Sequence, residues 1–319
     1  MKQQHHEHVD ADQAAHDPTA GTLTQPLRVA EEKTGWHRTN IAMMLSMHAL
    51  ALLAVVPAFF HWSGVVLVPV MFYLGAGLGI CLGYHRLLTH RSFETPKAIE
   101  YLLAMLGTLS MQGSPTQWVG THRIHHKESD GPHDPHSPQH GFTWSHILWC
   151  FYRHPDGHDP LDFTRDLQRD RGMMIIDRYF FIPQLVVSII LFALGWLILG
   201  PTLGGWQGGM CWLVWGVGVR TVVTFHATWF VNSAAHTWGY RNFDTDDGSR
   251  NNWWVALISF GEGWHNNHHA QQRSAAHGMR RWEIDPTFWV ILLMEKVGLA
   301  RRVVRPKLPT ANTIDAAAK

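Results

Sequence analysis

"TNIAMMLSMHALALLAVVPAFFHWSGVVLVPVMFYLGAGLGICLGY", Thr39 to Tyr84, contains no acidic residue, no lysine and no arginine. The stretch is about 46 residues long, more than twice the roughly 20 residues that one helix needs to cross a membrane. Its polar break is HWSG, His61–Gly64. We therefore predict two membrane-spanning helices, at about 41–60 and 65–84, joined by a tight turn.

A second apolar block, 180–231, shows the same pattern and breaks at GPTLGGWQGG, 200–209. It predicts spans at about 181–199 and 210–231, so that four spans form two hairpins. Arg220 is the one charged residue inside this block. Because a charge within a membrane is costly, we expect Arg220 to face the interior and to have a structural partner there.

Composition agrees with a membrane protein. Only 16% of the residues are charged, against about 25% in an average soluble domain. The 26 lysines and arginines nearly balance the 25 acidic residues, so a nucleic-acid partner is not expected. The three cysteines form no C-x-x-C motif and are expected to be buried thiols. We predict a disordered tail at 1–37, a membrane domain at 38–300 and a C-terminal tail at 301–319.

The basic residues indicate the orientation of the spans. Four precede residue 41, ten lie in 85–180, eleven lie in 232–319, and neither hairpin turn has any. By the positive-inside rule, both termini and the long central segment are cytoplasmic. Short apolar patches in these segments predict helices that cover the bundle. The predicted fold is therefore an all-α integral membrane protein with four transmembrane helices in two hairpins and a cytoplasmic helical cap.

Four histidine motifs lie in these cytoplasmic segments, most of them near span ends: HRLLTH, HRIHH, NSAAH and HNNHH. In H-x-x-H-H the three imidazoles share one face of a helix. Imidazole binds iron, copper, zinc and nickel, and nine imidazoles suit two ions better than one. The nine histidines are His85, His90, His122, His125, His126, His236, His265, His268 and His269.

His85 and His90 are five residues apart, which an ideal α-helix separates by about 140° around its axis. We therefore expect the helix to end or to distort between them. The histidines from His133 to His158 follow no helical face and are expected outside the ligand set. Together, the motifs predict a two-metal site held by the cap.

The stretches "GYHRLLTHRSF", "WVGTHRIHHKESDGPHDPHSPQHGFTWSH", "NSAAHTWGYR" and "GEGWHNNHHA" resemble those of the membrane fatty acid desaturases in order and spacing. From about Asn40 to Leu299 the chain is similar to the stearoyl-CoA or Δ9 acyl-lipid type. The resemblance implies that the nine histidines hold two Fe ions, a non-haem di-iron centre, with Asn232 as a water-mediated ligand.

The same resemblance implies an O₂-dependent enzyme that introduces a cis double bond, at the Δ9 position, into a long saturated acyl chain carried on CoA or a membrane lipid. The sequence has no HPGG-type haem motif. A separate electron donor of the ferredoxin, rubredoxin or cytochrome type is therefore implied.

Substrate contacts follow from the resemblance as well. Tyr73 would close the far end of the acyl tunnel, and Gly77, one turn nearer the metals, would leave it open. Trp118 would line the tunnel near its bend. Arg123 and Arg153 would contact a phosphate of CoA or of a lipid headgroup.

Two alternatives remain open at this point. A related membrane di-iron hydroxylase or monooxygenase would share the histidine motifs and yield an alcohol or ketone. A membrane metal transporter would hold its ligands near the bilayer midplane, between discontinuous helices. The position of the motifs at span ends and beyond favours the desaturase.

Overall fold

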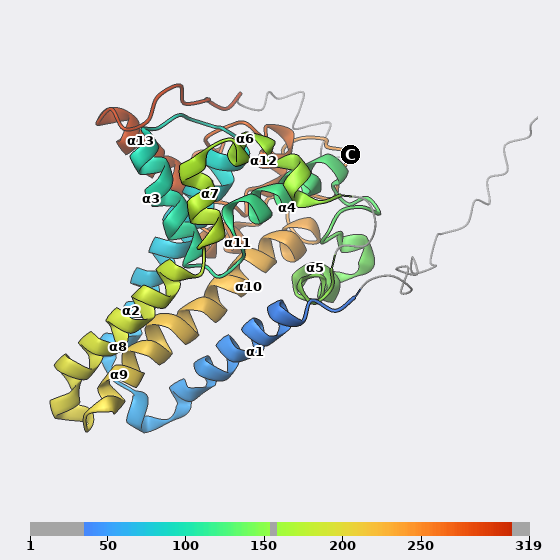
Figure 1. Cartoon of the computed structure of the whole chain (residues 1–319). Helices are drawn as coiled ribbons and strands as arrows, with labels where there is room; N and C mark the ends of the chain where they lie inside the picture. The colour runs from blue at the N-terminus through green and yellow to red at the C-terminus, as the bar shows by residue number, and fades with distance from the viewer. Residues whose placement is uncertain (1–34, 154–157, 308–319) are drawn as a thin grey trace, which may run out of the picture.

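The computed structural model describes residues 35–153 and 158–307. Most of the predicted N-terminal tail and residues 308–319 lie outside this range. The described residues form helices and no strand, with only isolated β-bridges. Four helices are long and apolar enough to cross a membrane: Arg38–Val55, Trp62–Thr89, Ile182–Leu203 and Trp206–His236. They form the two hairpins that the sequence predicts, and both turns lie at the same end of the molecule (Figure 1).

The first span comprises α1 (Arg38–Leu52) and η1 (Leu53–Val55), and so ends before the predicted residue 60. Val56 is extended because it precedes Pro57, and proline disfavours helix at the residue before it. A turn, η2 (Pro57–Phe59), follows. The third span, α8 (Ile182–Leu203), ends at Gly204, whose φ of 91° is a left-handed conformation that glycine adopts without strain.

The spans differ in length and burial. The second combines α2 (Trp62–Phe72) with η3 (Tyr73–Thr89), and the fourth combines α9 (Trp206–Leu213), η7 (Val214–Val219), α10 (Arg220–Ser233) and η8 (Ala234–His236). At 28 and 31 residues, both exceed the roughly 20 that a bilayer requires. In their most apolar windows, 44% and 61% of residues are buried, against 6% and 22% in the first and third spans. The second and fourth spans therefore form the interior and continue beyond the membrane.

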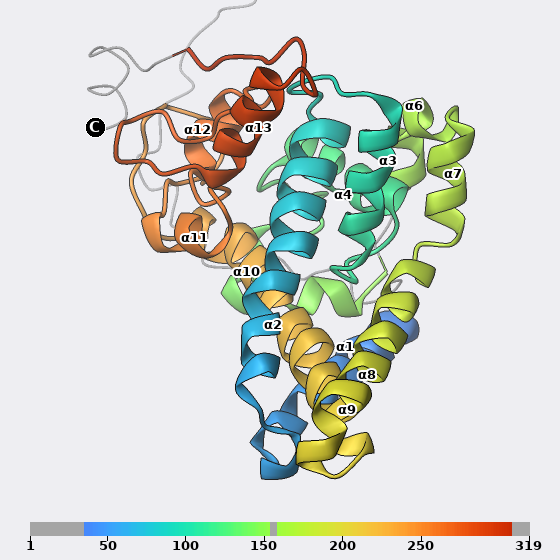
Figure 2. The same cartoon turned by 90° about the vertical axis from the view of Figure 1, so that its left-hand side faces the viewer.

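The remaining described segments, 90–153, 158–181 and 237–307, form a cap around the protruding ends of these two spans (Figure 2). The cap contains α3 (Lys97–Thr108), α4 (Pro115–Glu128), η4 (Pro138–His140), α5 (Phe142–His146), η5 (Leu148–Phe151), η6 (Pro160–Phe163), α6 (Arg165–Gln168), α7 (Arg171–Arg178), α11 (Trp253–Ile258), α12 (His265–Ala270) and α13 (Pro286–Lys296). Residues 301–307, assigned to the tail from sequence, lie against the cap through backbone hydrogen bonds of Val304 with Ser92 and Ala275.

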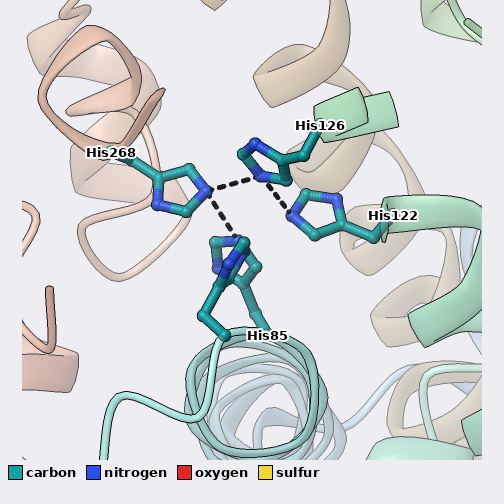
Figure 3. Close-up of side chains that lie close together, drawn as sticks. His85, His122, His126 and His268 are labelled. Carbon is teal, nitrogen blue, oxygen red and sulfur yellow. Dashed lines mark hydrogen bonds between the residues drawn. The ribbon is translucent and has the colours of Figure 1, made fainter. Parts of the chain in front are cut away.

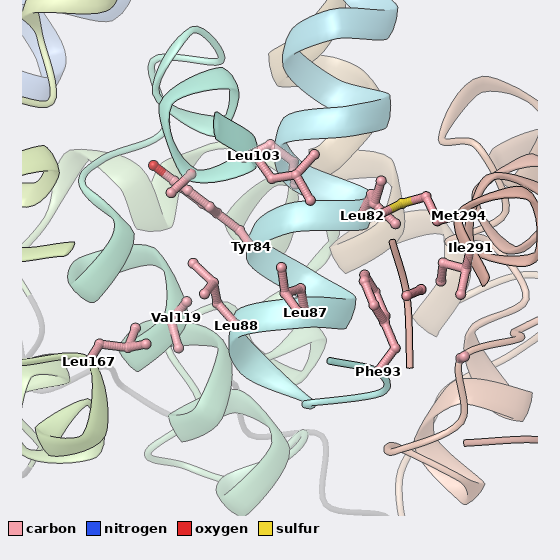
Figure 4. Packing of buried hydrophobic residues seen from close by; sticks show 14 of the residues in the cluster. Leu82, Tyr84, Leu87, Leu88, Phe93, Leu103, Val119, Leu167, Ile291 and Met294 are labelled. Carbon is pink, nitrogen blue, oxygen red and sulfur yellow. The ribbon is translucent and has the colours of Figure 1, made fainter. Parts of the chain in front are cut away.

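The end of η3 is the centre of the cap. Leu82, Tyr84, Leu87 and Leu88 lie in one buried cluster with residues of α3, α4, α6 and α13 (Figure 4). Gly79 makes the contact with α3 possible, because a Cβ there would lie 2.4 Å from the backbone nitrogen of Gly107. This packing fixes the part of η3 that carries His85.

Arg220 faces the interior, as predicted, and is completely buried. Its guanidinium donates to Gln184 Oε1 of α8 at 2.9 Å and to the carbonyl of Leu109. Arg220 therefore connects the fourth span to the third span and to the segment after α3.

Candidate metal centre

All nine predicted histidines converge where the second and fourth spans enter the cap. They form two groups. Each histidine contributes one ring nitrogen to its group, and within a group these nitrogens all lie within 4.8 Å of one another. The five-histidine group contains His85, His90, His122, His126 and His268, and the four-histidine group contains His125, His236, His265 and His269. Figure 3 shows His85, His122, His126 and His268 pointing at one another from η3, α4 and α12.

The geometry of η3 explains how His85 and His90 reach one group. This segment is π-helical, and the backbone N–H of His90 donates to the carbonyl of His85, five residues back, at 3.1 Å. A turn that closes over five residues brings positions i and i+5 to nearly the same face. The two rings are therefore 4.8 Å apart. The predicted distortion is confirmed, and the helix ends at Thr89.

Each of the two H-x-x-H-H motifs contributes histidines to both groups. His122 and His126, one turn apart on α4, belong to the five-histidine group, while His125 belongs to the other. On α12 the relation is reversed. His265 and His269 belong to the four-histidine group, and His268 to the other. Each motif thus contributes its i, i+4 pair to one group and its i+3 residue to the other.

Within each group the Nε2 atoms face each other at short range. The Nε2 of His268 lies 2.8 Å from that of His126 and 3.1 Å from that of His85. In the other group, Nε2 of His269 lies 3.3 Å from His125 and 3.1 Å from His265. Nitrogens bound to one ion at about 2.1 Å and at right angles are about 3 Å apart. The spacing therefore fits imidazoles arranged around a metal ion.

Carboxylates hold the outward-facing Nδ1 atoms of several of these histidines. The Nδ1 of His85 lies 2.6 Å from Glu262 Oε2. Three pairs stand behind the four-histidine group: His125 with Asp134 at 2.9 Å, His236 with Asp130 at 3.0 Å, and His269 with Asp247 at 2.7 Å. A carboxylate on Nδ1 keeps the proton there and directs the lone pair of Nε2 inward, as in many metal sites.

The charge at the site also fits two divalent ions. Arg86 is fully buried and pairs with Glu262 and Asp285, at 3.1 and 2.9 Å. With the three aspartates behind the four-histidine group, the site has five carboxylates and one arginine, a net charge of minus four. Uncompensated buried charge is costly, and two divalent cations would compensate it in full.

Six of the nine histidines have a pKa below the usual value, which favours the neutral form that a metal requires. His125 differs, because burial lowers its pKa but Asp134 outweighs this effect and raises it. Burial and the neighbouring imidazoles hold the pKa of His122, His126 and His268 well below the usual value for histidine. Burial lowers the pKa of His269 to about 4, although Asp247 acts in the opposite direction. Burial alone would raise the pKa of Asp134, but His125 and His136 lower it by a larger amount, so the net shift is strongly downward.

An apolar cavity of about 50 Å³ reaches the metal centre from the membrane side. Phe72, Ala76, Ile80 and His85 line it from the second span. Their spacing of four, four and five residues matches about 4.4 residues per turn of a π-helix, whose hydrogen bonds close over five residues.

Of the three residues that the resemblance assigns to the acyl tunnel, Trp118 lines this cavity and Tyr73 and Gly77 do not. Trp118 lines the cavity with its ring stacked on His122 at 5.1 Å, and Asn232 lines it from α10. Tyr73 is 38% exposed, its ring is 5.5 Å from that of Phe260, and it packs over Gly77. Their roles in selecting chain length stay predictions.

The predicted phosphate contacts lie elsewhere. Arg123 donates to Asp166 at 2.8 Å and to the carbonyls of Phe163 and Leu88, so its guanidinium is largely engaged within the cap. It borders a second, solvent-open pocket of about 410 Å³, which also reaches His90 and His126. Arg153 is exposed and lines neither cavity.

Sequence reasoning missed several polar residues of the site. His277 is fully buried, and its Nδ1 lies 2.9 Å from Glu262, the carboxylate that also contacts His85. Its ring centroid lies 4.4 Å from that of His268. His136, expected among the loop histidines, is buried 4.3 Å from the ring of His125. The one signal for the carboxylates is their position beside the motifs, as Glu262 in "GEGWH" and Asp134 in "PHDPH". His277 stands alone in a loop and gives no such signal.

Comparison with known proteins gives consistent matches. The model of the family "Fatty acid desaturase" matches residues 63–292. The sn-1 stearoyl-lipid 9-desaturase of Anabaena variabilis is 46% identical over 285 residues, covering 89% of this chain and 97% of that protein. The sn-2 palmitoyl-lipid 9-desaturase of Nostoc sp. (strain 36) is 46% identical over 83% of this chain and 89% of its own length. The acyl-CoA 5-desaturase AL21 of Anemone leveillei is 41% identical, with coverage of 85% and 81%.

Proposed function

The chain belongs to the fatty acid desaturase family, and from this premise we propose that it introduces a cis double bond at the Δ9 position of a long saturated acyl chain of a membrane lipid, using O₂ and a di-iron centre. As a fatty acyl desaturase it is an oxidoreductase of lipid metabolism. The family and the similar relatives favour this reaction over hydroxylation and over metal transport.

The observation that carries the proposal is the convergence of nine Nε2-bearing side chains into two groups with a compensating set of carboxylates. The five-histidine group would hold one iron and the four-histidine group the other. Asn232, beside His236 and on the cavity wall, would complete the second set through a water molecule. Iron with O₂ supplies the oxidising power that an unactivated C–H bond requires.

The protein residues position the substrate and keep water out. Phe72 at the end of α2 and Ala76 and Ile80 of η3 form an apolar path along the second span that leads to His85. Trp118 and His122 lie at its inner end, so two adjacent methylenes that reach this point lie beside the metal centre. A cavity of about 50 Å³ has the volume of about two water molecules. An acyl chain must therefore displace side chains as it enters, and its own surface then excludes water.

A lipid-bound acyl chain is favoured over acyl-CoA for two reasons. Two similar relatives, each 46% identical to this chain, are named lipid desaturases, although a named acyl-CoA desaturase that is 41% identical also matches. In addition, Arg123, one of the two predicted phosphate contacts, is engaged by Asp166 and by backbone carbonyls. We place both termini and the metal centre in the cytoplasm from the distribution of basic residues. A separate one-electron donor of the ferredoxin, rubredoxin or cytochrome type completes the reaction.

Expression in a host that lacks unsaturated fatty acids tests the proposed function. The extracted fatty acids are converted to their dimethyl disulfide adducts and analysed by gas chromatography with mass spectrometry, which should show a cis double bond at Δ9. A hydroxylated product, or no new product from a metal-loaded protein, would refute the proposal. Purified enzyme supplied with stearoyl-lipid or stearoyl-CoA then separates the two substrate forms, and the lipid is expected to react faster.

A further inference from the structure

The solvent-open pocket beside the five-histidine group, here called the basic pocket, has no role in the account so far. It is lined by Thr89, His90, Arg91, Arg123, His126, Lys127, Gln272 and Arg273. Four of these eight residues are cationic and none is acidic. Two others, His90 and His126, belong to the five-histidine group. The basic pocket is therefore a positively charged opening that leads directly to candidate metal ligands.

The charges on its rim are available to a partner. The side chains of Arg91 and Lys127 are 61% and 54% exposed. Asp166 pairs with both Arg91 and Arg123, and Glu128 pairs with Lys127 at 3.0 Å. Four cations against two carboxylates leave a net charge of plus two. Arg273 is exposed and has no ion pair among the described residues.

The position of the basic pocket favours a soluble partner. Thr89, which lines it, is the last residue of the 28-residue second span. The cap end of this span lies opposite the hairpin turns (Figure 2). Roughly 20 residues cross the bilayer, so this end projects into water. A lipid headgroup stays at the membrane interface, whereas the acyl chain would reach the site through the separate apolar cavity.

The reaction itself requires a partner. Converting –CH₂–CH₂– to –CH=CH– releases two electrons and two protons, while reducing O₂ to two waters consumes four of each. The balance is R–CH₂–CH₂–R′ + O₂ + 2 e⁻ + 2 H⁺ → R–CH=CH–R′ + 2 H₂O. Two further electrons must therefore come from a reduced carrier, which must approach the metals closely.

We propose that the basic pocket is the docking surface for the electron donor, and that this donor is a soluble one-electron carrier with an acidic surface. The inference rests on the proposed desaturase function. Charge complementarity steers association and orients the donor, with the imidazoles of His90 and His126 between the two redox centres. Arg91, Lys127 and Arg273 supply the steering charge.

The test uses the full-length, metal-loaded protein in lipid nanodiscs, with stearoyl-lipid as substrate and a reduced plant-type ferredoxin of acidic surface as the probe. The double variant Lys127→Glu/Arg273→Glu is compared with Arg171→Glu/Arg281→Glu. The second pair makes the same change of charge at two exposed arginines that line neither cavity. Metal content and kcat/KM for ferredoxin are measured for each protein.

The pocket variant should lower kcat/KM for ferredoxin by about tenfold or more at low ionic strength, and the difference from wild type should shrink as salt screens the charges. The control pair should retain the wild-type value. If Lys127→Glu/Arg273→Glu fails to bind metal, the milder variant Lys127→Gln/Arg273→Gln is used instead. Its kcat/KM for ferredoxin should also fall, by a smaller factor that again shrinks with salt.

Two results would overturn the docking proposal. One is a pocket variant with the wild-type KM for ferredoxin and the wild-type salt dependence. The other is a change of KM confined to the acyl substrate, which would make the basic pocket a phosphate site. If wild-type protein forms no alkene with any reductant, the proposed function fails instead.

Discussion

The five-histidine group and the four-histidine group differ in how many of their Nδ1 atoms lie next to a carboxylate. Three of the four histidines in the smaller group have an aspartate on Nδ1: Asp134, Asp130 and Asp247. In the larger group, Glu262 behind His85 is the one such carboxylate among the described residues. The buried Nδ1 atoms of His126 and His268 have no hydrogen-bond partner among the described residues, and in the smaller group the same is true of His265.

The two groups also differ in access. His90 and His126 line the solvent-open basic pocket, whereas His125 and His265 are buried, at 1% and 2% exposure. A carboxylate on Nδ1 makes an imidazole more basic and fixes its orientation. The four-histidine group should therefore bind its ion more tightly. The five-histidine group compensates with one more imidazole and is the side that faces a redox partner.

Loss of one ligand should have the largest effect. His126→Ala or His125→Ala should abolish alkene formation in the expression host, because each removes an inward-facing Nε2. His133→Ala is the control, since this exposed histidine belongs to neither group. Full activity in either ligand variant would remove that histidine from the metal centre.

Removal of a supporting charge should have the next largest effect. Asp134→Asn keeps the size of the side chain but removes the anion from His125. We expect the metal affinity of the four-histidine group to fall by about 10- to 100-fold, the range typical for such partners. Competition with a chelator of known affinity measures the change. An unchanged affinity would show that the aspartates do not account for the difference between the groups.

Metal removal from the wild-type protein should proceed in two phases. The ion of the five-histidine group, which borders the solvent-open pocket, should leave first, at least a few times faster than the other, because it has fewer supporting carboxylates. Stopped-flow chelation can follow both phases. In His126→Ala only the slow phase should remain, and a surviving fast phase would reverse the assignment.

Substitution of His277 should have the smallest effect. It touches the five-histidine group through Glu262 and through ring contacts with His268 and His85. His277→Ala should weaken metal binding in that group by less than about tenfold and leave the slow phase of chelation unchanged. A loss as large as that of His126→Ala would indicate that His277 is itself a ligand.

Much of this arrangement could be predicted from the sequence. Uncharged stretches and their breaks predict the four spans, and the i, i+3, i+4 spacing predicts that three imidazoles share a face. The pairing of His125 with Asp134 and of His269 with Asp247 could not be predicted, because it depends on how the chain folds between residues 9 and 22 positions apart.

The cavity shows a second limit of the sequence. Counting back from His85 in α-helical turns would not give the residues that line the cavity, because η3 is π-helical and rotates less per residue. The face that leads to His85 therefore carries Phe72, Ala76 and Ile80. No local propensity signals a π-helix of this length, and its packing around Gly79 against α3 arises only in the folded cap.

The central claim, that the two histidine groups each hold one ion, is tested most directly by counting metal. Iron is measured per chain in the purified wild type, in His126→Ala, in His125→Ala and in the double variant. The account predicts two ions in the wild type, one in each single variant and none in the double variant. One ion in the wild type, or two in both single variants, would contradict it.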